Sequence, residues 1–232
     1  MPSIVFASPK GGVGKSTSAV LLATELARKG AGVTLIDADP NRPLSRWAKL
    51  PGKPESLTVV SDVTEDTLIP AIDTAAQKMP FVIVDLEGTA SQMIPYAMSR
   101  ADLVIIPTQG SQLDAAEAVK AIRVVKNQEL AFRRQIPAAI LFTRTNAAIR
   151  PRTLKSIEAE FRNNGLTIFD VQLHERDAFR AIFAFGGTLS ELPVSDVSNI
   201  PAAINNARAF ASEVVAILKR NKPQAEQRRE VA

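Results

Sequence analysis

The chain has 232 residues, enough for one well-buried domain, and its 46% hydrophobic and 22% charged residues match an ordinary globular protein. It contains no cysteine and a single histidine, which excludes disulfides, thiolate metal sites and histidine-rich metal centres. No apolar run approaches the roughly 18 residues of a membrane span, and no signal-peptide pattern opens the chain, so we expect a cytoplasmic protein without a membrane partner.

Short runs rich in β-branched residues alternate with helical stretches along the chain. Most runs are apolar at nearly every position, which is typical of strands buried on both faces of a parallel sheet. The alternation predicts a single doubly wound α/β domain over residues 1–220, with helices on both faces of a mostly parallel sheet. The predicted strands are Ser3–Ser8, Val33–Asp37, Leu57–Val60, Phe81–Asp85, Leu103–Pro107, Ala138–Thr143 and, more weakly, Leu166–Phe169, and the predicted helices are Ser16–Lys29, Thr64–Gln77, Leu113–Asn127, Arg152–Asn163 and Ile200–Arg220.

The last twelve residues differ in composition from the rest of the chain. Asn221–Ala232 combines Pro223 with Gln, Glu and Arg and has almost nothing to bury. This composition predicts a disordered tail over residues 221–232, with a short basic contact arm as the alternative.

A glycine-rich segment, Lys10-Gly11-Gly12-Val13-Gly14-Lys15-Ser16-Thr17, connects the first predicted strand to the first predicted helix. Glycines let the backbone curl so that successive N–H groups point inward, and the helix N-terminus adds the positive end of its dipole. In such a P-loop, Lys15 reaches the β- and γ-phosphates, Ser16 ligates Mg²⁺ and Thr17 bonds the α-phosphate. The segment therefore predicts ATP and Mg²⁺ binding. It departs from the ordinary pattern because Pro9 holds the position of the first glycine.

Carboxylates follow two of the predicted strands at the edge where doubly wound folds bind ligands. Asp37 and Asp39 follow one strand, and Asp85 ends another in the form of a Walker B strand, an apolar run followed by aspartate. Because Mg²⁺ prefers oxygen ligands and keeps several waters, we expect Asp37 and Asp85 to act on the metal through water. Asp39 is placed to orient the attacking water. Alone, each acid is often only a cap, but behind this P-loop the series predicts a catalytic metal site.

Basic residues are concentrated in the middle of the chain. From Lys120 to Lys155 there are nine bases and one acid, Glu129, whereas the remainder has 19 bases and 23 acids. A segregated stretch of this kind is a candidate polyanion-binding face, and the alternative is a solvated surface that is merely basic.

The phosphate loop, followed by Asp37-Ala38-Asp39-Pro40, resembles the deviant Walker A ATPases of the ParA/MinD family. The resemblance continues through Asp85 and the segment 101–109, so it covers the nucleotide half densely and the C-terminal half thinly. Within the family, the chain is similar to small plasmid-partition ParA proteins that lack an N-terminal helix-turn-helix domain. Residues 41–47 and 174–179 are also similar to a ParA relative used in conjugative T-DNA transfer.

The resemblance implies a slow, switch-type ATPase that converts ATP and water to ADP and phosphate while two subunits enclose two ATP molecules. Lys10 would cross the interface to the partner's phosphates, as an arginine finger does, and Gly11 would be small because the partner loop approaches it. Arg144 and Asn146 are the expected adenine contacts. Glu87 departs from the common family form, and its role stays open between a contact to water or partner and a surface carboxylate.

Partition ParA proteins bind DNA without sequence preference as ATP dimers, and a ParB-like centromere-binding protein stimulates the hydrolysis that releases them. For this chain the resemblance implies a nucleoid-associated bacterial DNA partition ATPase. The alternative is a MinD-like or conjugation-associated ATPase that positions or recruits a protein complex; the membrane-binding version requires a C-terminal amphipathic face that residues 221–232 lack. The cations expected to contact DNA phosphates are Lys120, Arg123, Lys126, Arg150, Arg152, Lys155, Arg180 and Arg208.

Overall fold

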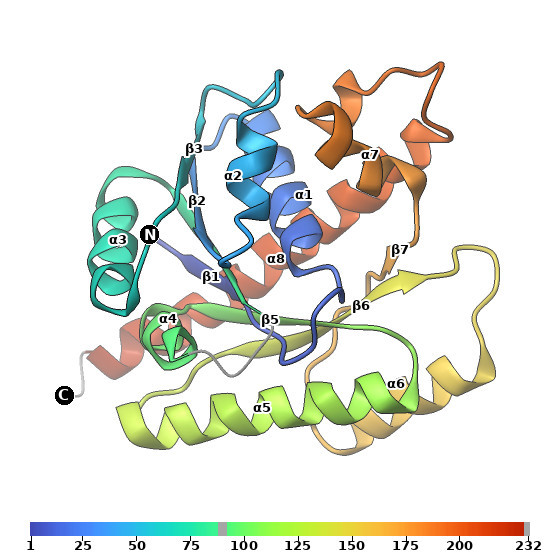
Figure 1. The fold of residues 1–232 in the computed structure, drawn as a ribbon. Coiled ribbons are helices and arrows are strands. Elements are labelled where there is room, and N and C mark those ends of the chain that lie inside the picture. The colour runs from blue at the N-terminus through green and yellow to red at the C-terminus, as the bar shows by residue number, and fades with distance from the viewer. Residues whose placement is uncertain (88–91, 230–232) are drawn as a thin grey trace.

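A parallel sheet forms the centre of the molecule (Figure 1). The computed structural model describes residues 1–87 and 92–229, and within them seven strands pair in the order β3-β2-β4-β1-β5-β6-β7. Every pairing is parallel. The doubly wound α/β fold is thus confirmed. The strands are β1 (Ser3–Phe6), β2 (Val33–Ala38), β3 (Leu57–Val60), β4 (Phe81–Leu86), β5 (Leu103–Thr108), β6 (Ala138–Thr145) and β7 (Leu173–His174).

Helices cover both faces of the sheet. Because successive side chains of a strand point to opposite faces, each strand contributes side chains to two separate buried clusters. In β1, Ile4 and Phe6 join one buried cluster, whereas Val5 joins the other. The first cluster includes residues of α1 (Lys15–Arg28), α2 (Pro43–Ala48), α7 (Asp177–Phe185) and α8 (Ile200–Arg229), and the second includes residues of α3 (Glu65–Lys78), α4 (Met93–Arg100), α5 (Gln112–Phe132) and α6 (Arg152–Asn163). A short 3₁₀ turn, η1 (Leu189–Glu191), lies between α7 and α8.

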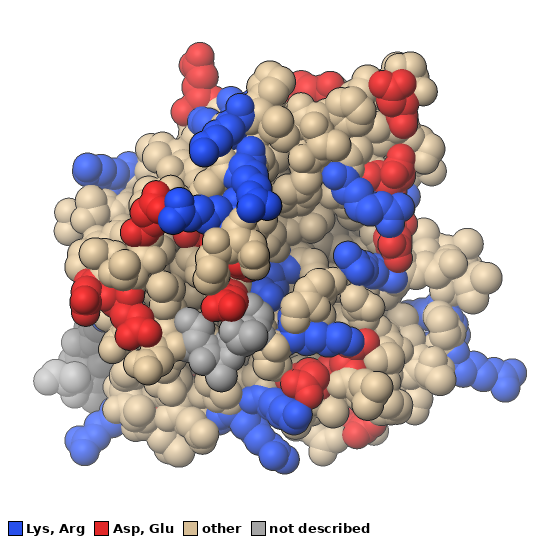
Figure 2. All heavy atoms as spheres, viewed as in Figure 1, with Lys and Arg blue, Asp and Glu red and all other residues tan. Residues whose placement is uncertain are grey.

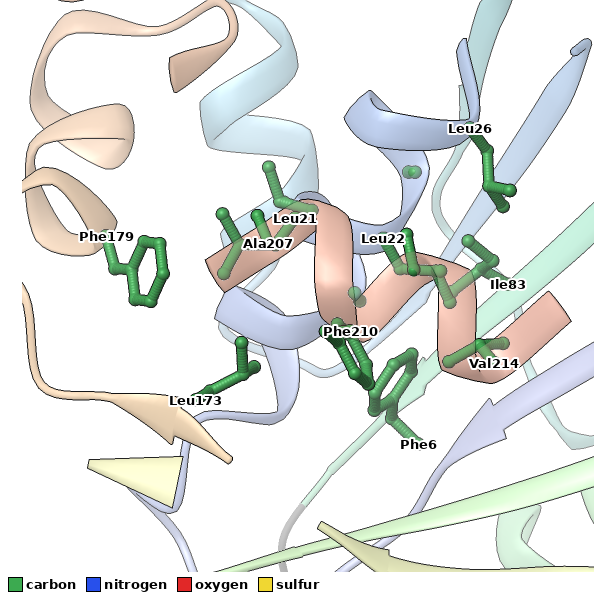
Figure 3. Close-up of a cluster of buried hydrophobic side chains, with 14 of the residues drawn as sticks. Phe6, Leu21, Leu22, Leu26, Ile83, Leu173, Phe179, Ala207, Phe210 and Val214 are labelled. Atoms are coloured by element: carbon green, nitrogen blue, oxygen red, sulfur yellow. The ribbon is translucent and has the colours of Figure 1, made fainter. Parts of the chain in front are cut away.

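The first cluster fixes α1, the helix that follows the glycine-rich loop. Figure 3 draws Leu21 and Leu22 of α1 together with Phe6 of β1 and Phe210 and Val214 of α8, all of them fully buried. Each large apolar side chain buried in this way contributes about 1.5–3 kcal/mol relative to exposure. This packing anchors α1 against the sheet.

None of the helices in the described part of the chain is both long and apolar enough to cross a membrane.

The predicted weak strand at Leu166–Phe169 is wrong. In this segment only Ile168 forms an isolated bridge, to Ile140 of β6, and the seventh strand lies further on, at Leu173–His174. The reason is a side chain from α8: the Glu213 carboxylate accepts hydrogen bonds from the backbone N–H groups of Asp170 and Val171, at 2.7 and 2.8 Å. These donors are satisfied without a strand partner, so the chain turns away before pairing resumes.

Helices α4 and α7 were not predicted from the sequence, whereas α2 is the short helix that the sequence indicates around Trp47. Two other helices are longer than expected. Helix α5 continues to Phe132 instead of Asn127, and α8 continues to Arg229 instead of Arg220. Positions 230–232 of the expected tail lie outside the described residues, and a disordered tail over 221–232 stays a prediction.

Candidate functional site

The loop between β1 and α1 curls at two glycines and is held in place from β6. Gly12 and Gly14 have φ angles of +73° and +91°, a region in which any other L-residue is strained. The buried Thr143 hydroxyl lies 2.7 Å from the Val13 carbonyl and 3.1 Å from the Thr108 carbonyl. The loop that the sequence identified is therefore fixed against the ends of β5 and β6.

This loop forms one wall of a pocket of about 360 Å³. The pocket brings together residues that are far apart in the sequence, from the loop itself and from the ends of β2, β4 and β6. Its lining residues are Gly11, Gly12, Gly14, Lys15, Ser16, Thr17, Asp39, Asn41, Glu87 and Arg144. Lys10, Val13, Asp37, Asp85 and Asn146, which the sequence also proposed for the site, are not among them.

Lys15 is a buried cation at the start of α1. Its side chain is only slightly exposed, and burial lowers its pKa, an effect that the negative charges of Asp85, Asp39 and Glu87 oppose. Its ammonium lies 3.5 Å from the Lys10 carbonyl, the weak end of hydrogen-bond distance. A buried cation with acids around it, but with no ion pair among the residues that the structure describes, is well placed to bind a polyanion entering the pocket.

Asp37 and Asp85 are direct neighbours at the carboxyl ends of β2 and β4, where they pair in register. Oδ2 of Asp37 accepts hydrogen bonds from Ser45 N and Oγ, both at 2.8 Å, while its Oδ1 and both oxygens of Asp85 are buried without a hydrogen-bond partner among the described residues. Burial raises the pKa of Asp85 to about 7, although the nearby Ser16 hydroxyl and Lys15 ammonium oppose this.

Burial also raises the pKa of Asp37, against the opposing effect of the Ser45 hydrogen bonds. Two adjacent buried carboxylates with three unpartnered oxygens are costly in an apolar setting unless something binds them. Hard oxygen donors next to a serine hydroxyl are the ligand set that Mg²⁺ prefers. The residues therefore fit a divalent cation.

Asp39 lies on the pocket wall, beyond the end of β2. Its Oδ1 accepts hydrogen bonds from the backbone N and the Nδ2 of Asn41, at 2.8 and 3.0 Å. Oδ2 has no partner among the described residues. This oxygen is free to accept a hydrogen bond from a water in the pocket.

Lys10 does not point into the pocket but binds a carboxylate of its own chain. Its ammonium lies 2.5 Å from Oδ1 of Asp114, in the first turn of α5. Sequence reasoning missed Asp114, although Ser111 three residues earlier marks a helix start, and its hydroxyl accepts from the Asp114 N–H as an N-cap does.

A smaller pocket of about 50 Å³ lies beside the loop, between β6, β7 and α7. Thr17, Ser18, Arg144, His174, Arg176 and Phe179 are among its lining residues. Ser18 Oγ and Arg176 Nε are buried beside this pocket and have no hydrogen-bond partner among the described residues.

Of the two proposed adenine contacts, the structure brings only Arg144 to these pockets, and Arg144 lines both. The Asn146 amide oxygen instead accepts from the backbone N–H groups of Ala148 and Ile149, at 2.8 and 3.0 Å. His174 and Arg176 were not identified from the sequence as pocket residues. Burial and the charge of Arg176 lower the pKa of His174, whose Nδ1 lies 2.9 Å from the Thr145 hydroxyl.

The eight cations proposed for DNA do not share one face of the molecule. Those of α5 and α6 lie on one side of the sheet, whereas Arg180 of α7 and Arg208 of α8 belong to helices on the other. Figure 2 shows Lys and Arg side chains dispersed among acids in this view rather than gathered in one patch. Five have acidic partners: Lys120 with Glu117, Lys126 with Glu129, Arg150 with Glu158, Arg180 with Glu175, and Arg208 with Glu25.

The other three, Arg123, Arg152 and Lys155, are exposed and form no ion pair within the described part of the chain. These three lie on α5 and α6, which Figure 1 shows along the same edge of the molecule.

Comparison with known proteins identifies the group to which the chain belongs. The family model described as VirC1 protein matches residues 1–220. The chain is 45% identical to Protein ParA of Rhizobium radiobacter over 214 residues, 92% of this chain and 96% of the relative. It is 29% identical to Protein virC1 of Rhizobium radiobacter over 225 residues, 94% of this chain and 96% of the relative.

A solved ATP complex of a variant of McdA from Cyanothece has the same fold. Its TM-score is 0.75 at 17% identity, over 92% of this chain and 96% of that chain. From the family match over residues 1–220 and the 45% identity to Protein ParA, this chain belongs to the VirC1 family and, with it, to the ParA/MinD family of ATPases.

Proposed function

We propose that this chain is a magnesium-dependent ATPase of DNA segregation: its ATP-bound dimer binds DNA without sequence preference, and hydrolysis, stimulated by a ParB-like partner, releases it. One observation carries the enzymatic part. Lys15, Ser16 and Thr17 line one pocket together with Asp39, next to buried carboxylates with unpartnered oxygens. The relative named Protein ParA and the ATP complex of McdA support the same reading.

ATP would lie with its phosphates in the larger pocket and its nucleoside in the smaller one, on either side of Arg144. Lys15 would bind the β- and γ-phosphates, and Ser16, Asp37 and Asp85 would hold Mg²⁺, which would neutralise phosphate charge. The free Oδ2 of Asp39 orients the attacking water. The Arg144 and Arg176 side chains, which line the smaller pocket, would contact the nucleoside.

The loop itself supports a dimer. Lys10 and Gly11 are exposed, and a Cβ added at Gly11 would meet no atom of the described residues within 4 Å. The described part of the chain therefore offers no packing reason for glycine at this position. The loop of a partner subunit that approaches Gly11 closely would supply such a reason. Lys10 would then reach the phosphates of the ATP bound to the partner.

The test compares wild type with Asp39→Ala, measuring ATP turnover, molecular mass and retention on random-sequence DNA with ADP or ATP. We expect turnover to fall at least about a hundredfold, as for loss of a group that acts on the attacking water. The dimer and its DNA complex should persist with ATP. Wild-type turnover in Asp39→Ala, or no ATP-dependent DNA retention by wild type, would contradict the proposal.

A second candidate is a conjugation-associated ATPase that recruits a DNA-processing complex, favoured by the VirC1 family model. The same DNA assay separates the two. Equal retention on random DNA and on transfer-origin DNA supports segregation, whereas retention confined to transfer-origin DNA supports the second candidate.

A further inference from the structure

The last strand of the sheet, β7, pairs with β6 along one edge, and a side chain of α8 occupies its other edge. Toward β6, the Glu175 N–H donates to the Thr145 carbonyl at 2.9 Å. Toward α8, the side-chain amide of Asn206 accepts from the His174 N–H at 3.0 Å and donates to the Gln172 carbonyl at 2.8 Å. Asn206 therefore forms the hydrogen bonds that a further strand would form.

An asparagine side chain can replace a strand here because its amide carries the same carbonyl acceptor and N–H donor as a peptide group. The helix that carries it is firmly anchored, since Ala203, Ala207 and Phe210 of α8 are completely buried in the first cluster. About two helical turns further along α8, Glu213 accepts from the backbone of the segment before β7. The position of β7 is thus set from α8 as well as from β6.

Strand β7 in turn carries one wall of the smaller pocket. His174 lines this pocket, and so does Arg176, two residues further on. The His174 ring is oriented by the Thr145 hydroxyl, which lies 2.9 Å from its Nδ1. Asn206 itself does not line the pocket, so it lies behind the wall and contacts only the backbone of β7 and of the residue before it.

We propose that Asn206 is a positioning residue for the nucleoside, because it fixes β7 so that His174 and Arg176 keep their places on the wall of the smaller pocket. The inference rests on the proposed function, in which the nucleoside of ATP lies in this pocket. A wall that is already ordered reduces the entropy lost when a ligand binds. The phosphate loop is held separately, through Thr143, so the loss of the amide affects nucleoside binding and leaves phosphate binding unchanged.

The test uses the full chain with Asn206→Asp, which keeps the shape of the side chain and the acceptor for His174 but removes the donor to the Gln172 carbonyl. An unpaired carbonyl facing a carboxylate disfavours the bound position of β7 by about ten- to a hundredfold, and the apparent affinity falls by the same factor. With Mg²⁺, we expect this loss for a non-hydrolysable ATP analogue. The affinity for inorganic triphosphate, measured by competition, should stay at the wild-type value.

A spectroscopic measurement follows β7 directly. His174 is the only histidine of the chain, so its imidazole gives a single, unambiguous NMR signal when the protein carries no histidine tag. In wild type, the ATP analogue should shift this signal and triphosphate should not. In Asn206→Asp, the signal should differ from that of wild type before any ligand is added, and the analogue should shift it less at equal concentration.

Two further variants separate the hydrogen bonds from the added charge. Asn206→Ala breaks both hydrogen bonds without adding a charge, and it should lose analogue affinity as Asn206→Asp does. Asn205→Asp adds the same charge at the neighbouring, exposed position and should behave as wild type. Thermal unfolding of every variant shows that the fold is retained.

The outcomes separate this inference from the proposed function. Unchanged analogue affinity in Asn206→Asp, or an equal loss for the analogue and for triphosphate, overturns the positioning role of Asn206 and leaves the proposed function intact. If wild type binds the analogue no more tightly than triphosphate and the His174 signal responds to neither, the nucleoside does not lie in the smaller pocket and the inference falls with that placement. If wild type does not bind the analogue at all, the proposed ATPase itself fails.

Discussion

At the scale of single residues, the site is defined by buried charges that its own chain leaves incompletely paired. Asp85 is fully buried and neither of its oxygens has a hydrogen-bond partner among the described residues. A fold that keeps such a group sacrifices stability unless a ligand compensates the charge. Asp85 is therefore best explained by function, and its replacement should stabilise the ligand-free chain.

The first prediction concerns Asp85→Asn. Burial raises the folded-state pKa of Asp85 to about 7 from its ordinary value of 3.8, so the folded chain holds a proton that the unfolded chain has lost between these values. The contribution of Asp85 to the free energy of unfolding therefore falls as pH rises from about 4 to 7, by a few kcal/mol at about 1.36 kcal/mol per pKa unit.

Urea unfolding of wild type and Asp85→Asn at pH 5 and pH 8, with a chelator present, checks this. We expect Asp85→Asn to be more stable than wild type at pH 8, with a smaller difference at pH 5. The variant should also lose magnesium-dependent ATP binding. If the difference in free energy of unfolding between the two proteins is the same at both pH values, the buried charge of Asp85 is not the cause of that difference.

At the scale of elements, α2 connects the acids of the site to α7. Ser45 of α2 binds Asp37, and Trp47 of α2 donates from Nε1 to the Gly187 carbonyl at 3.2 Å. Just after α7, Gly186 has a φ of +84°, and a Cβ there would lie 2.5 Å from Leu50 Cβ. The end of α7 is therefore packed so tightly against the end of α2 that only glycine fits.

The second prediction compares Gly186→Ala with Gly30→Ala. Both glycines have nearly the same φ, +84° and +83°, but a Cβ at Gly30 meets no described atom within 4 Å. Gly30→Ala should cost about 1–2 kcal/mol from backbone strain alone. Gly186→Ala should cost clearly more, because Gly186 combines these close contacts with a ψ of −167°, a backbone region essentially confined to glycine. It should also weaken ATP binding, because α7 lines the smaller pocket. Urea unfolding and ATP titration measure both, and equal losses in the two variants would refute the packing argument.

The sequence predicted elements where the local pattern and the packing agree, and failed where distant groups decide. Strands β1 to β6 are apolar runs in the sequence. The loop before α1 is recognisable because its sequence places glycines where the backbone adopts positive φ. Glu213, which accepts from the backbone N–H just after the Ile168 bridge, lies 43 residues beyond Asp170, and the contact of Lys10 with Asp114 spans 104 residues. No local window contains such contacts, so neither the smaller pocket nor the Lys10–Asp114 pair was predictable.

At the scale of the whole molecule, the basic segment of the sequence is not one basic surface. Arg150 pairs with the buried Glu158, which also accepts a hydrogen bond from Gln172, so its loss would disturb the fold as well as any DNA contact. Surface pairs such as Lys120 with Glu117 are worth little and can exchange for phosphate. The clean test of DNA binding therefore uses cations without acidic partners.

The third prediction is that Arg123→Gln/Arg152→Gln/Lys155→Gln weakens ATP-dependent binding to random-sequence DNA without changing ATP affinity. Each phosphate contact contributes a slope of about −0.9 to the plot of log affinity against log salt, so losing three contacts should make the slope shallower by almost three units. Binding measured from low to physiological salt gives this slope directly.

The control variant is Lys29→Gln/Lys49→Gln/Lys78→Gln, which removes the same charge from exposed lysines that also lack an ion pair within the described residues. Because net charge falls equally, a general electrostatic attraction would weaken binding equally in both variants. A loss of slope confined to the first variant locates the DNA on α5 and α6. Equal slopes in the two variants would mean that DNA, if bound, lies on another surface of the dimer.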